Sequence, residues 1–295
     1  MVSRWFSRRF ATAMALVWAG GSAGGLVLSP VTEALAASLE WRNASLVIAA
    51  SVVVATLIAA LLARGPSSPA EAGFAPDGDA ISPEAMATSN REEAKPAGAR
   101  GGLKSINPFI ALVMFVAIAG DGMMAIAVLS QQPAFLEGAG ISPSNAALVL
   151  GLTSGGCFLG AATIGWLLDR FRGVWSSLLV ISTIAVGLLV LAILGSTPSL
   201  VISILGGLCL GYGVGAAEVL WITMTKRQFG EALFPITYGG WYFSLQVGYA
   251  IGGGVGGLGI QLFGALGFLV LVGAMYLPAA ISSLLLRAAR KTGSA

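Results

Sequence analysis

The sequence contains no histidine, and only 10% of its 295 residues are charged. Without histidine there is no Ser-His-Asp or Cys-His catalysis, no histidine-ligated metal and no histidine proton relay. Soluble domains carry about 25% charged residues, so this chain cannot cover its surface with polar groups in water. Together with a mean hydropathy of +0.87, this composition predicts an integral membrane protein.

Cysteine is scarce as well, because Cys157 and Cys209 are the only two and lie in different apolar runs. They lack the spacing of a zinc or redox motif, and we expect them to be free thiols that pack as small apolar groups. No nucleophile, base or metal cluster can be assembled from the remaining residues. We therefore expect no enzymatic activity, no cofactor, no metal and no nucleic-acid partner.

What the sequence has in abundance is long apolar runs that are rich in glycine, which supplies 41 residues. A helix needs about 20 apolar residues to cross a bilayer, and small residues let such helices pack closely. The runs predict an all-α membrane protein, a polytopic bundle of about eight transmembrane helices at 10–36, 43–63, 106–129, 144–168, 174–195, 199–223, 235–258 and 262–286.

One long polar stretch interrupts these runs. Residues 64–105 hold several prolines and eleven charges of both signs, a composition typical of a flexible linker. The chain is therefore expected to consist of a part with two transmembrane helices (1–63), a cytoplasmic linker (64–105) and a part with six helices (106–295).

The positions of lysine and arginine indicate the orientation, since cytoplasmic loops are enriched in both. If the N-terminus lies in the cytoplasm, fifteen of the sixteen lie in inner segments and only Arg42 lies outside. We expect a multi-pass protein of the bacterial inner membrane with both termini in the cytoplasm.

The first residues allow another interpretation. Ser7-Arg8-Arg9-Phe10, the apolar run after it and Ala34-Leu35-Ala36 are similar to a cleaved twin-arginine export signal. The glycine pairs Gly20-Gly21 and Gly24-Gly25 favour a helix that is retained and packed.

Five stretches carry a resemblance to a known family. In order along the chain they are Trp5–Ala11, Trp41-Arg42, Gly140–Ala147, Gly165–Gly173 (GWLLDRFRG) and Phe229–Gly240. The fourth resembles the G-x-x-x-D-R-x-G/R-x loop of the major facilitator superfamily. The others resemble motifs of its monocarboxylate and oxalate/formate porter branch.

The resemblance implies a secondary active transporter that moves a small solute by alternating access between two six-helix halves. Residues 106–295 then correspond to a complete C-terminal half and 1–63 to the last two helices of the N-terminal half. Four helices of the family pattern are missing, so a complementing chain is one expected partner. A monocarboxylate in symport with a proton is the cargo that the branch implies. The alternative is a membrane scaffold or assembly partner that keeps the six-helix half without transporting.

The loop motif supplies the first candidate residues, Gly165, Asp169, Arg170 and Arg172. The resemblance implies a cytoplasmic gating latch in which Asp169 caps or pairs with the end of a neighbouring helix, where the helix dipole favours an acidic group. The other interpretation is a solvated turn whose positive charges follow the topology.

Acidic residues inside membrane spans are costly and indicate function by default. Asp121 and Glu218 lie in spans that line the central cavity in the family, and we expect them to contact substrate or a coupled proton. Alternatively, Asp121 bonds to neighbouring backbone or a hydroxyl, and Glu218 pairs with Lys226 or Arg227. Glu33, near the outer end of its span, is expected to be interfacial.

Tyr238, Tyr242, Gln246 and Tyr249 recur at helical spacing and share one side of a helix. Tyr242 and Gln246 are candidates for binding a polar substrate, whereas an interfacial aromatic belt explains Tyr238 and Trp241 equally well.

Two further patterns limit the function. The glycine clusters 211–215 and 252–257 lack the lysine of a phosphate-binding loop and are expected to serve close helix packing or a bend. No lysine or arginine lies in the core of any span. The positive anchor that an anionic substrate needs would have to come from another chain or from spans outside this sequence.

Overall fold

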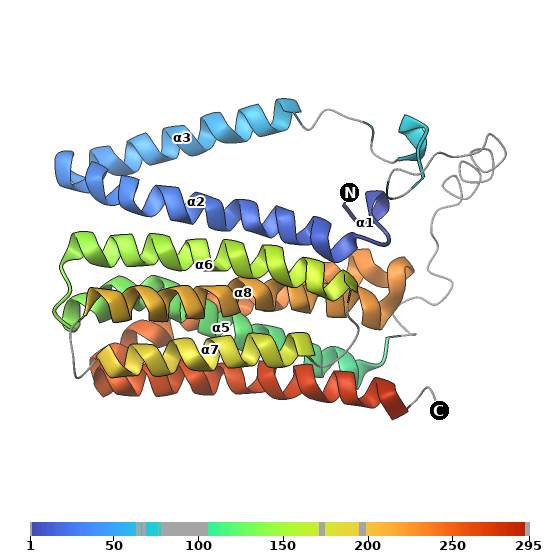
Figure 1. The fold of residues 1–295 in the computed structure, drawn as a ribbon. Coiled ribbons are helices and arrows are strands. Elements are labelled where there is room, and N and C mark those ends of the chain that lie inside the picture. Colours follow the sequence, from blue (N-terminus) through green and yellow to red (C-terminus); the bar gives the residue numbers. More distant parts are fainter. Residues whose placement is uncertain are drawn as a thin grey trace.

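The chain folds as a bundle of long helices, shown in Figure 1. The structure is a computed structural model that describes residues 2–62, 66, 69–75, 77, 106–170, 175–194 and 199–292. Its elements are α1 (Val2–Trp5), α2 (Phe10–Ser38), α3 (Trp41–Leu62), the short helix η1 (Ala70–Ala72), α5 (Pro108–Gly138), α6 (Pro143–Arg170), α7 (Trp175–Leu194) and α8 (Leu200–Thr292).

The helical stretch α8 has 93 residues and breaks twice. Gly230 has a φ of 77° and Gly264 a φ of 65°, values that residues with a side chain rarely adopt. The breaks leave a first segment (200–229), a second segment (231–263) and a third segment (265–292). One unbroken helix would be about 140 Å long, several times the thickness of a bilayer core. The three segments are therefore separate crossings.

The all-helical membrane bundle predicted from the sequence is confirmed. Within the described residues, seven helices are long and apolar enough to cross a membrane. One of them, Leu200–Gly264, contains the break at Gly230 and supplies two crossings. The start of α2 and the end of α8 lie at the same end of the bundle (Figure 1). We call this end the basic end, because it carries Arg8, Arg9, Arg170, Lys226 and Arg227.

Helix α5 is longer than its apolar run predicts. The sequence places its end near residue 129, before the polar Ser130-Gln131-Gln132, whereas the helix continues to Gly138. Gln132 is only 2% exposed, and its amide nitrogen donates a hydrogen bond to Oγ1 of Thr153 in α6 at 2.9 Å. A polar residue that finds a partner inside the bundle does not end the helix. At the other end, Asn107 caps the helix by accepting from the N–H groups of Phe109 and Ile110.

Glycines set the distance between α8 and its neighbours. A Cβ added at Gly211 or Gly215 would overlap the main-chain oxygen of Thr153 or Cys157 in α6. Gly248 and Gly252 meet α5 in the same way, at the oxygens of Ala119 and Met123. These four glycines thus provide the close helix packing that the sequence predicts for the glycine clusters.

Helix α3 lies at the edge of the bundle and packs against α2 (Figure 1). Of its 22 residues only Ala44 is buried, while large apolar side chains such as Leu57 and Leu62 are exposed. In a bilayer these side chains face lipid or another protein.

Two adjacent glycines provide a test of the packing. Gly252→Ala places a methyl group on the Met123 oxygen, whereas a Cβ at Gly253 meets nothing within 4 Å. We expect Gly252→Ala to destabilise the protein by about 1–3 kcal/mol through overpacking and to lower the Tm in detergent. Gly253→Ala should leave the Tm unchanged or raise it slightly, because alanine favours helix. Equal Tm values for the two variants would contradict this packing.

Candidate functional site

The first turn of α2 is capped by a carboxylate from another helix. The N–H groups at a helix start have no partner within the helix, and Arg9 at the start of α2 gives no side-chain cap. Asp169, in the last turn of α6, accepts hydrogen bonds from the N–H groups of Ala11 (3.2 Å) and Thr12 (2.9 Å). Its Oδ2 also accepts from the Thr12 hydroxyl at 2.7 Å. Asp169 therefore joins α6 to α2 at the basic end.

The other residues of the loop motif surround this contact. A Cβ at Gly165, one turn earlier, would overlap Cβ of Ala15 and lie 2.9 Å from the main-chain oxygen of Ala11, so glycine here lets α2 and α6 meet. Arg170 places its guanidinium 5.6 Å from the ring centre of Trp166. Arg172 lies outside the described residues.

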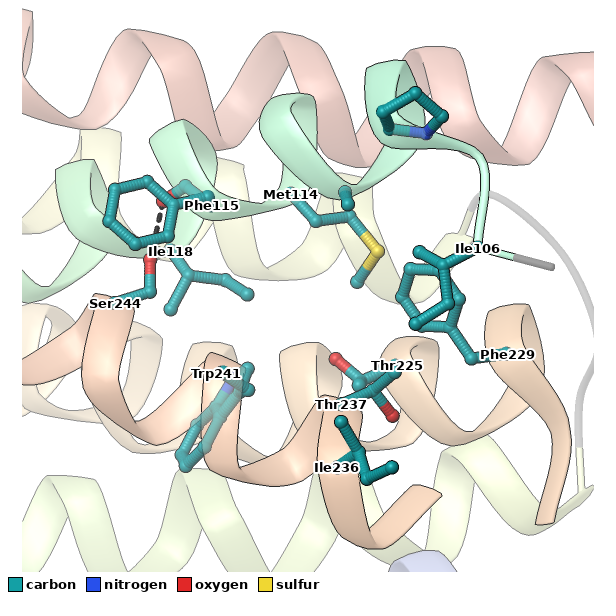
Figure 2. Close-up of a pocket in the computed structure, with 13 residues that line it drawn as sticks. Ile106, Met114, Phe115, Ile118, Thr225, Phe229, Ile236, Thr237, Trp241 and Ser244 are labelled. Atoms are coloured by element: carbon teal, nitrogen blue, oxygen red, sulfur yellow. Dashed lines mark hydrogen bonds between the residues drawn. The ribbon is translucent and has the colours of Figure 1, made fainter. Parts of the chain in front are cut away.

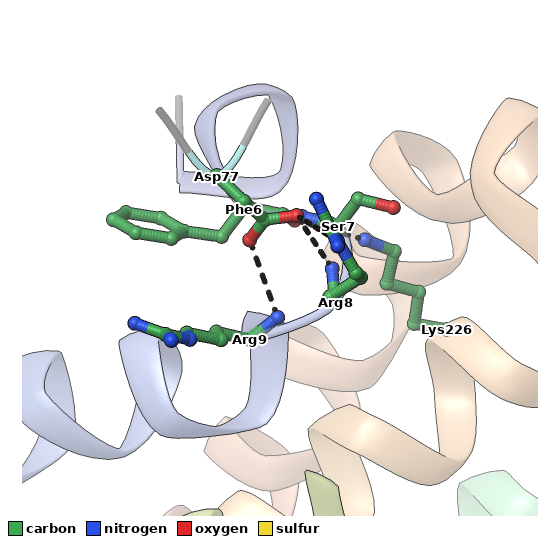
Figure 3. A network of polar contacts seen from close by, with 6 residues as sticks. All are labelled: Phe6, Ser7, Arg8, Arg9, Asp77 and Lys226. Atoms are coloured by element: carbon green, nitrogen blue, oxygen red, sulfur yellow. Dashed lines mark hydrogen bonds and ion pairs between the residues drawn. The ribbon is translucent and has the colours of Figure 1, made fainter. Parts of the chain in front are cut away.

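A second carboxylate, that of Asp77, binds the turn just before α2, as Figure 3 shows. Asp77 accepts from the N–H groups of Ser7 (3.3 Å), Arg8 (2.9 Å) and Arg9 (3.3 Å). The Arg8 Nε lies 3.8 Å from Oδ2, but the Arg8 side chain is 73% exposed, so water screens this ion pair. The main-chain bonds are the stronger part of the attachment.

Lys226 and Arg227 bring α8 to the same place. The Lys226 ammonium lies 3.5 Å from the main-chain oxygen of Phe6, 4.0 Å from the ring centre of Phe10 and 3.7 Å from Oε1 of Glu231. Arg227 donates to the main-chain oxygen of Leu168 in α6. The basic end thus joins α2, α6 and α8 through charged side chains bound to main-chain groups.

The environment of Asp77 lowers the pKa of its carboxyl group. Partial burial acts to raise the pKa, but the hydrogen bonds from Arg8, Arg9 and Ser7 and the charge of Arg8 outweigh it and bring the pKa below the usual 3.8. A carboxyl whose pKa is lower in the folded state stabilises that state above its unfolded pKa and loses this effect as the pH falls through the folded value. The attachment of Asp77 is therefore present at neutral pH and is lost only below about pH 4.

Aromatic rings close the space between α2 and the second segment of α8. Phe10 meets Phe234 edge-on with ring centres 5.3 Å apart, and Trp18 meets Trp241 in the same way at 5.7 Å. Tyr238 stacks on Trp241 at 5.4 Å. These contacts hold Trp241 in a fixed orientation with only 3% of its surface exposed.

Two of the acidic residues inside the membrane spans, Asp121 and Glu218, lie close together. Asp121 in α5 and Glu218 in the first segment of α8 are near enough to interact electrostatically. Glu218 is half-buried, and its Oε1 accepts a hydrogen bond from the Tyr249 hydroxyl at 2.8 Å. Asp121 is 2% exposed, and its Oδ1 has no hydrogen-bond partner in the part of the chain that the structure describes.

Glycines on either side of Asp121 explain its position. A Cβ at Gly120 would lie 2.7 Å from the main-chain oxygen of Met275, and one at Gly122 would lie 2.7 Å from that of Leu245. Because α5 approaches the second and third segments of α8 so closely, the Asp121 side chain lies inside the six-helix part, within electrostatic range of Tyr276.

The candidate residues from the sequence fall into two groups. Asp121 and Glu218 come together, whereas Tyr242 and Gln246 are exposed and lie outside this cluster, with Tyr242 47% exposed. Tyr249 shares their helical side and is the residue that contacts Glu218. The interpretation of Glu218 as a partner of Lys226 is not what the structure shows, because Lys226 lies beside Glu231.

Sequence reasoning missed Asp77 and gave Tyr249 too little weight. For Tyr249 a signal existed, since it lies one helical turn beyond Gln246 on the same side. For Asp77 the only signal was the uncapped, basic start of α2, which favours an acidic group from elsewhere.

The cap of α2 by Asp169 and the binding of the preceding turn by Asp77 can be tested separately by amide hydrogen exchange. Asp77→Ala should speed exchange at Ser7, Arg8 and Arg9 by about tenfold or more, because hydrogen bonds to charged groups are worth roughly 1.5–3 kcal/mol. Asp169→Ala should do the same at Ala11 and Thr12.

Each variant serves as the control for the other, and the core amides of α5 report whether the fold is intact. Equal protection of residues 7–9 in Asp77→Ala and in the unmodified protein would contradict the role given to Asp77.

Comparison with known proteins adds one match. A family model described as Major Facilitator Superfamily matches residues 1–233, which include α2, α3, α5, α6, α7 and the first break of α8. No curated protein sequence matches the chain.

Proposed function

Because the chain belongs to the major facilitator superfamily, we propose that it is a secondary active transporter that moves a small solute across the membrane by alternating access. The family and the membrane-spanning helices support a transporter of this type. In such proteins two helical parts move against each other around a site near the middle of the membrane. Glu218 and Asp121 are the groups we assign to that site, as carriers of a coupled proton or as contacts of the solute.

The observation that carries this assignment is the buried Asp121 oxygen without a partner. A buried, unpaired carboxylate is costly, and acidic residues inside a membrane are rare unless they function. The neighbouring carboxyl of Glu218 adds a like charge, so the pair favours holding at least one proton. Half-buried Glu218 is the member that a proton or solute reaches first, and Tyr249 orients its carboxyl.

The contacts at the basic end support the alternation between states. Asp169 joins α6 to α2 there, Arg227 joins α8 to α6, and Lys226 of α8 reaches Phe6 and Phe10. Opening this side for solute release therefore requires breaking charge-assisted hydrogen bonds. We propose that these bonds hold one state closed and re-form after each cycle, with Gly165 permitting the close contact of α2 and α6.

The orientation of the chain in the membrane and its location in the cell can be proposed from the basic end. We propose that the basic end faces the cytoplasm of a bacterium, with the chain in its inner membrane, because positively charged loops favour the inner side.

We place the solute in the class of small polar molecules, with monocarboxylates as the first candidates because the motif at 229–240 resembles that of the monocarboxylate branch. The cores of the spans supply no lysine or arginine for an anion, because those that lie in the helices are near their ends. A carboxylate would therefore enter together with a proton, or its anchor would come from a complementing chain.

Transport in proteoliposomes that contain a pH indicator tests the assignment. Imposed gradients of small carboxylates such as formate and lactate should move protons with the solute in the unmodified protein. Glu218→Gln and Asp121→Asn should each lower this proton movement by at least about tenfold, since a single buried hydrogen-bonding or charged group contributes on that scale. Glu137→Gln, at the exposed end of α5, is the matched control.

Proton movement that stays at the unmodified level in both variants would remove Glu218 and Asp121 from the site. If neither the unmodified protein nor any variant moves solute, the alternative function, a membrane scaffold that does not transport, would be favoured.

A labelling experiment tests the orientation. Glu40, between α2 and α3, and Glu231, at the basic end, are both exposed. In intact cells a membrane-impermeant maleimide should react with Glu40→Cys and not with Glu231→Cys, while both should react after the membrane is opened. The unmodified protein gives the background of Cys157 and Cys209. Reaction of Glu231→Cys in intact cells would reverse the proposed topology.

A further inference from the structure

The connection between α3 and α5 is tied back to the turn that precedes α2, as Figure 3 shows. Asp77, which lies in this connection, accepts hydrogen bonds from the three N–H groups of residues 7–9. Its side chain is only 7% exposed. We call residues 69–75 and 77 the strap, because they join the connection between the two helical parts to the start of α2.

Lys226, in the first segment of α8, contacts the two residues that border this turn. Its ammonium lies 3.5 Å from the main-chain oxygen of Phe6 and 4.0 Å from the ring centre of Phe10. Asp77 holds residues 7–9, which lie between these two partners. The Lys226 side chain is 13% exposed, so water and salt screen its contacts little. The position of the turn therefore decides whether Lys226 finds its partners on the side of α2.

The backbone of Asp77 indicates that this contact sets its position. Its φ is 68°, and no other residue with a side chain has a positive φ in the part of the chain that the structure describes. Sparsely populated backbone conformations persist where the surroundings hold them. Three N–H donors from a turn about 70 residues away hold this one.

The second segment of α8 has room to move away from α2. A cavity of about 350 Å³ lies between α5 and the first and second segments of α8, toward the basic end (Figure 2). Trp241 lines this cavity and also meets Trp18 of α2 edge-on, so this part of the second segment lies between α2 and the cavity. In a close-packed interior a helix shifts most easily toward unfilled space, where it avoids overpacking.

We propose that the strap holds the basic end closed. While Asp77 binds residues 7–9, the turn presents Phe6 and Phe10 to Lys226, and release of Asp77 lets α8 separate from α2. A turn that is already ordered loses less conformational entropy when it binds, so the attached strap favours the closed state. The inference rests on the alternating access proposed above, because it requires that the basic end opens in one state. It adds that the connection between the helical parts regulates this opening.

A cysteine at position 14 can report the opening. Phe10 and Trp18, four residues before and after Met14, both meet rings of the second segment of α8, so Met14 shares the side that faces this segment. Met14 is 6% exposed. With Cys157 and Cys209 replaced by alanine and the full chain in lipid nanodiscs, a water-soluble maleimide should label Met14→Cys slowly.

Asp77→Asn should speed this labelling at least about threefold, because it removes the charge from three charge-assisted hydrogen bonds. Asparagine tolerates a positive φ as aspartate does, so the variant adds no backbone strain. Glu40→Gln, which removes an exposed charge at the opposite end of α2, is the matched control and should leave the rate unchanged.

A second substitution tests whether the strap acts through Lys226. Lys226→Met should also speed labelling at position 14, since it removes the partner of Phe6 and Phe10. The double variant with Asp77→Asn should label no faster than Lys226→Met alone. Two independent effects would multiply, and that result would contradict the proposed route.

A reporter elsewhere in the bundle separates opening from loss of structure. Ile184 of α7 is 1% exposed and faces Gly213 in the first segment of α8, and Ile184→Cys should react slowly and equally in every variant. Faster labelling at both reporters in Asp77→Asn would overturn the proposal, because the strap would then hold the whole fold together.

The two single variants also distinguish the strap from alternating access itself. If Lys226→Met speeds labelling at position 14 and Asp77→Asn does not, the strap is refuted and the opening of the basic end stands. If neither variant speeds it, the basic end does not open through this contact, and the proposed alternation at this end is refuted as well.

Discussion

The structure depends on main-chain contact between α8 and the helices on either side of it. In a membrane, burial of apolar side chains gives little drive for helices to associate, so close packing has to supply it. Gly211 and Gly215 bring the first segment of α8 onto α6, and Gly248 and Gly252 bring the second segment onto α5. Gly120 and Gly122 do the same from the side of α5. Asp121, Glu218 and Tyr249 lie close together because the backbones of α5 and α8 pack so closely.

The basic end is built on a different principle. There, the first turn of α2 has N–H groups that its own side chains do not cap. Carboxylates distant in sequence bind this first turn and the turn just before it. Asp169 is 157 and 158 residues away from its partners, and Asp77 is 68 to 70 residues away. The molecule thus combines close backbone packing at its centre with charge-assisted hydrogen bonds at one end.

The sequence predicts the helices well, because hydrocarbon imposes a length and a hydropathy that are visible in the chain itself. The same criterion failed at the end of α5, where Gln132 is polar yet buried against Thr153. Hydropathy records what a residue costs in lipid and not whether a neighbouring helix offers it a partner.

The candidate site was predictable only in part. Asp121 and Glu218 stand out because acids inside spans are rare, and the motif around Asp169 draws attention to that loop. Helical spacing places Tyr242, Gln246 and Tyr249 on one side, but which of them faces Glu218 depends on the rotation of the second segment, which its packing sets. The Asp77 contact and the cavity beside Trp241 arise from segments far apart in sequence. No local pattern encodes them.

The sparse contacts of α3 have a consequence for how the protein responds to its membrane. Only Ala44 of this helix is buried, and a short connection at Leu39 and Glu40 joins it to α2. A helix with so little protein surface around it adjusts its tilt to the thickness of the surrounding lipid, at a modest cost for each ångström of mismatch. α3 therefore follows the bilayer, while the glycine-packed helices beside it keep their own geometry.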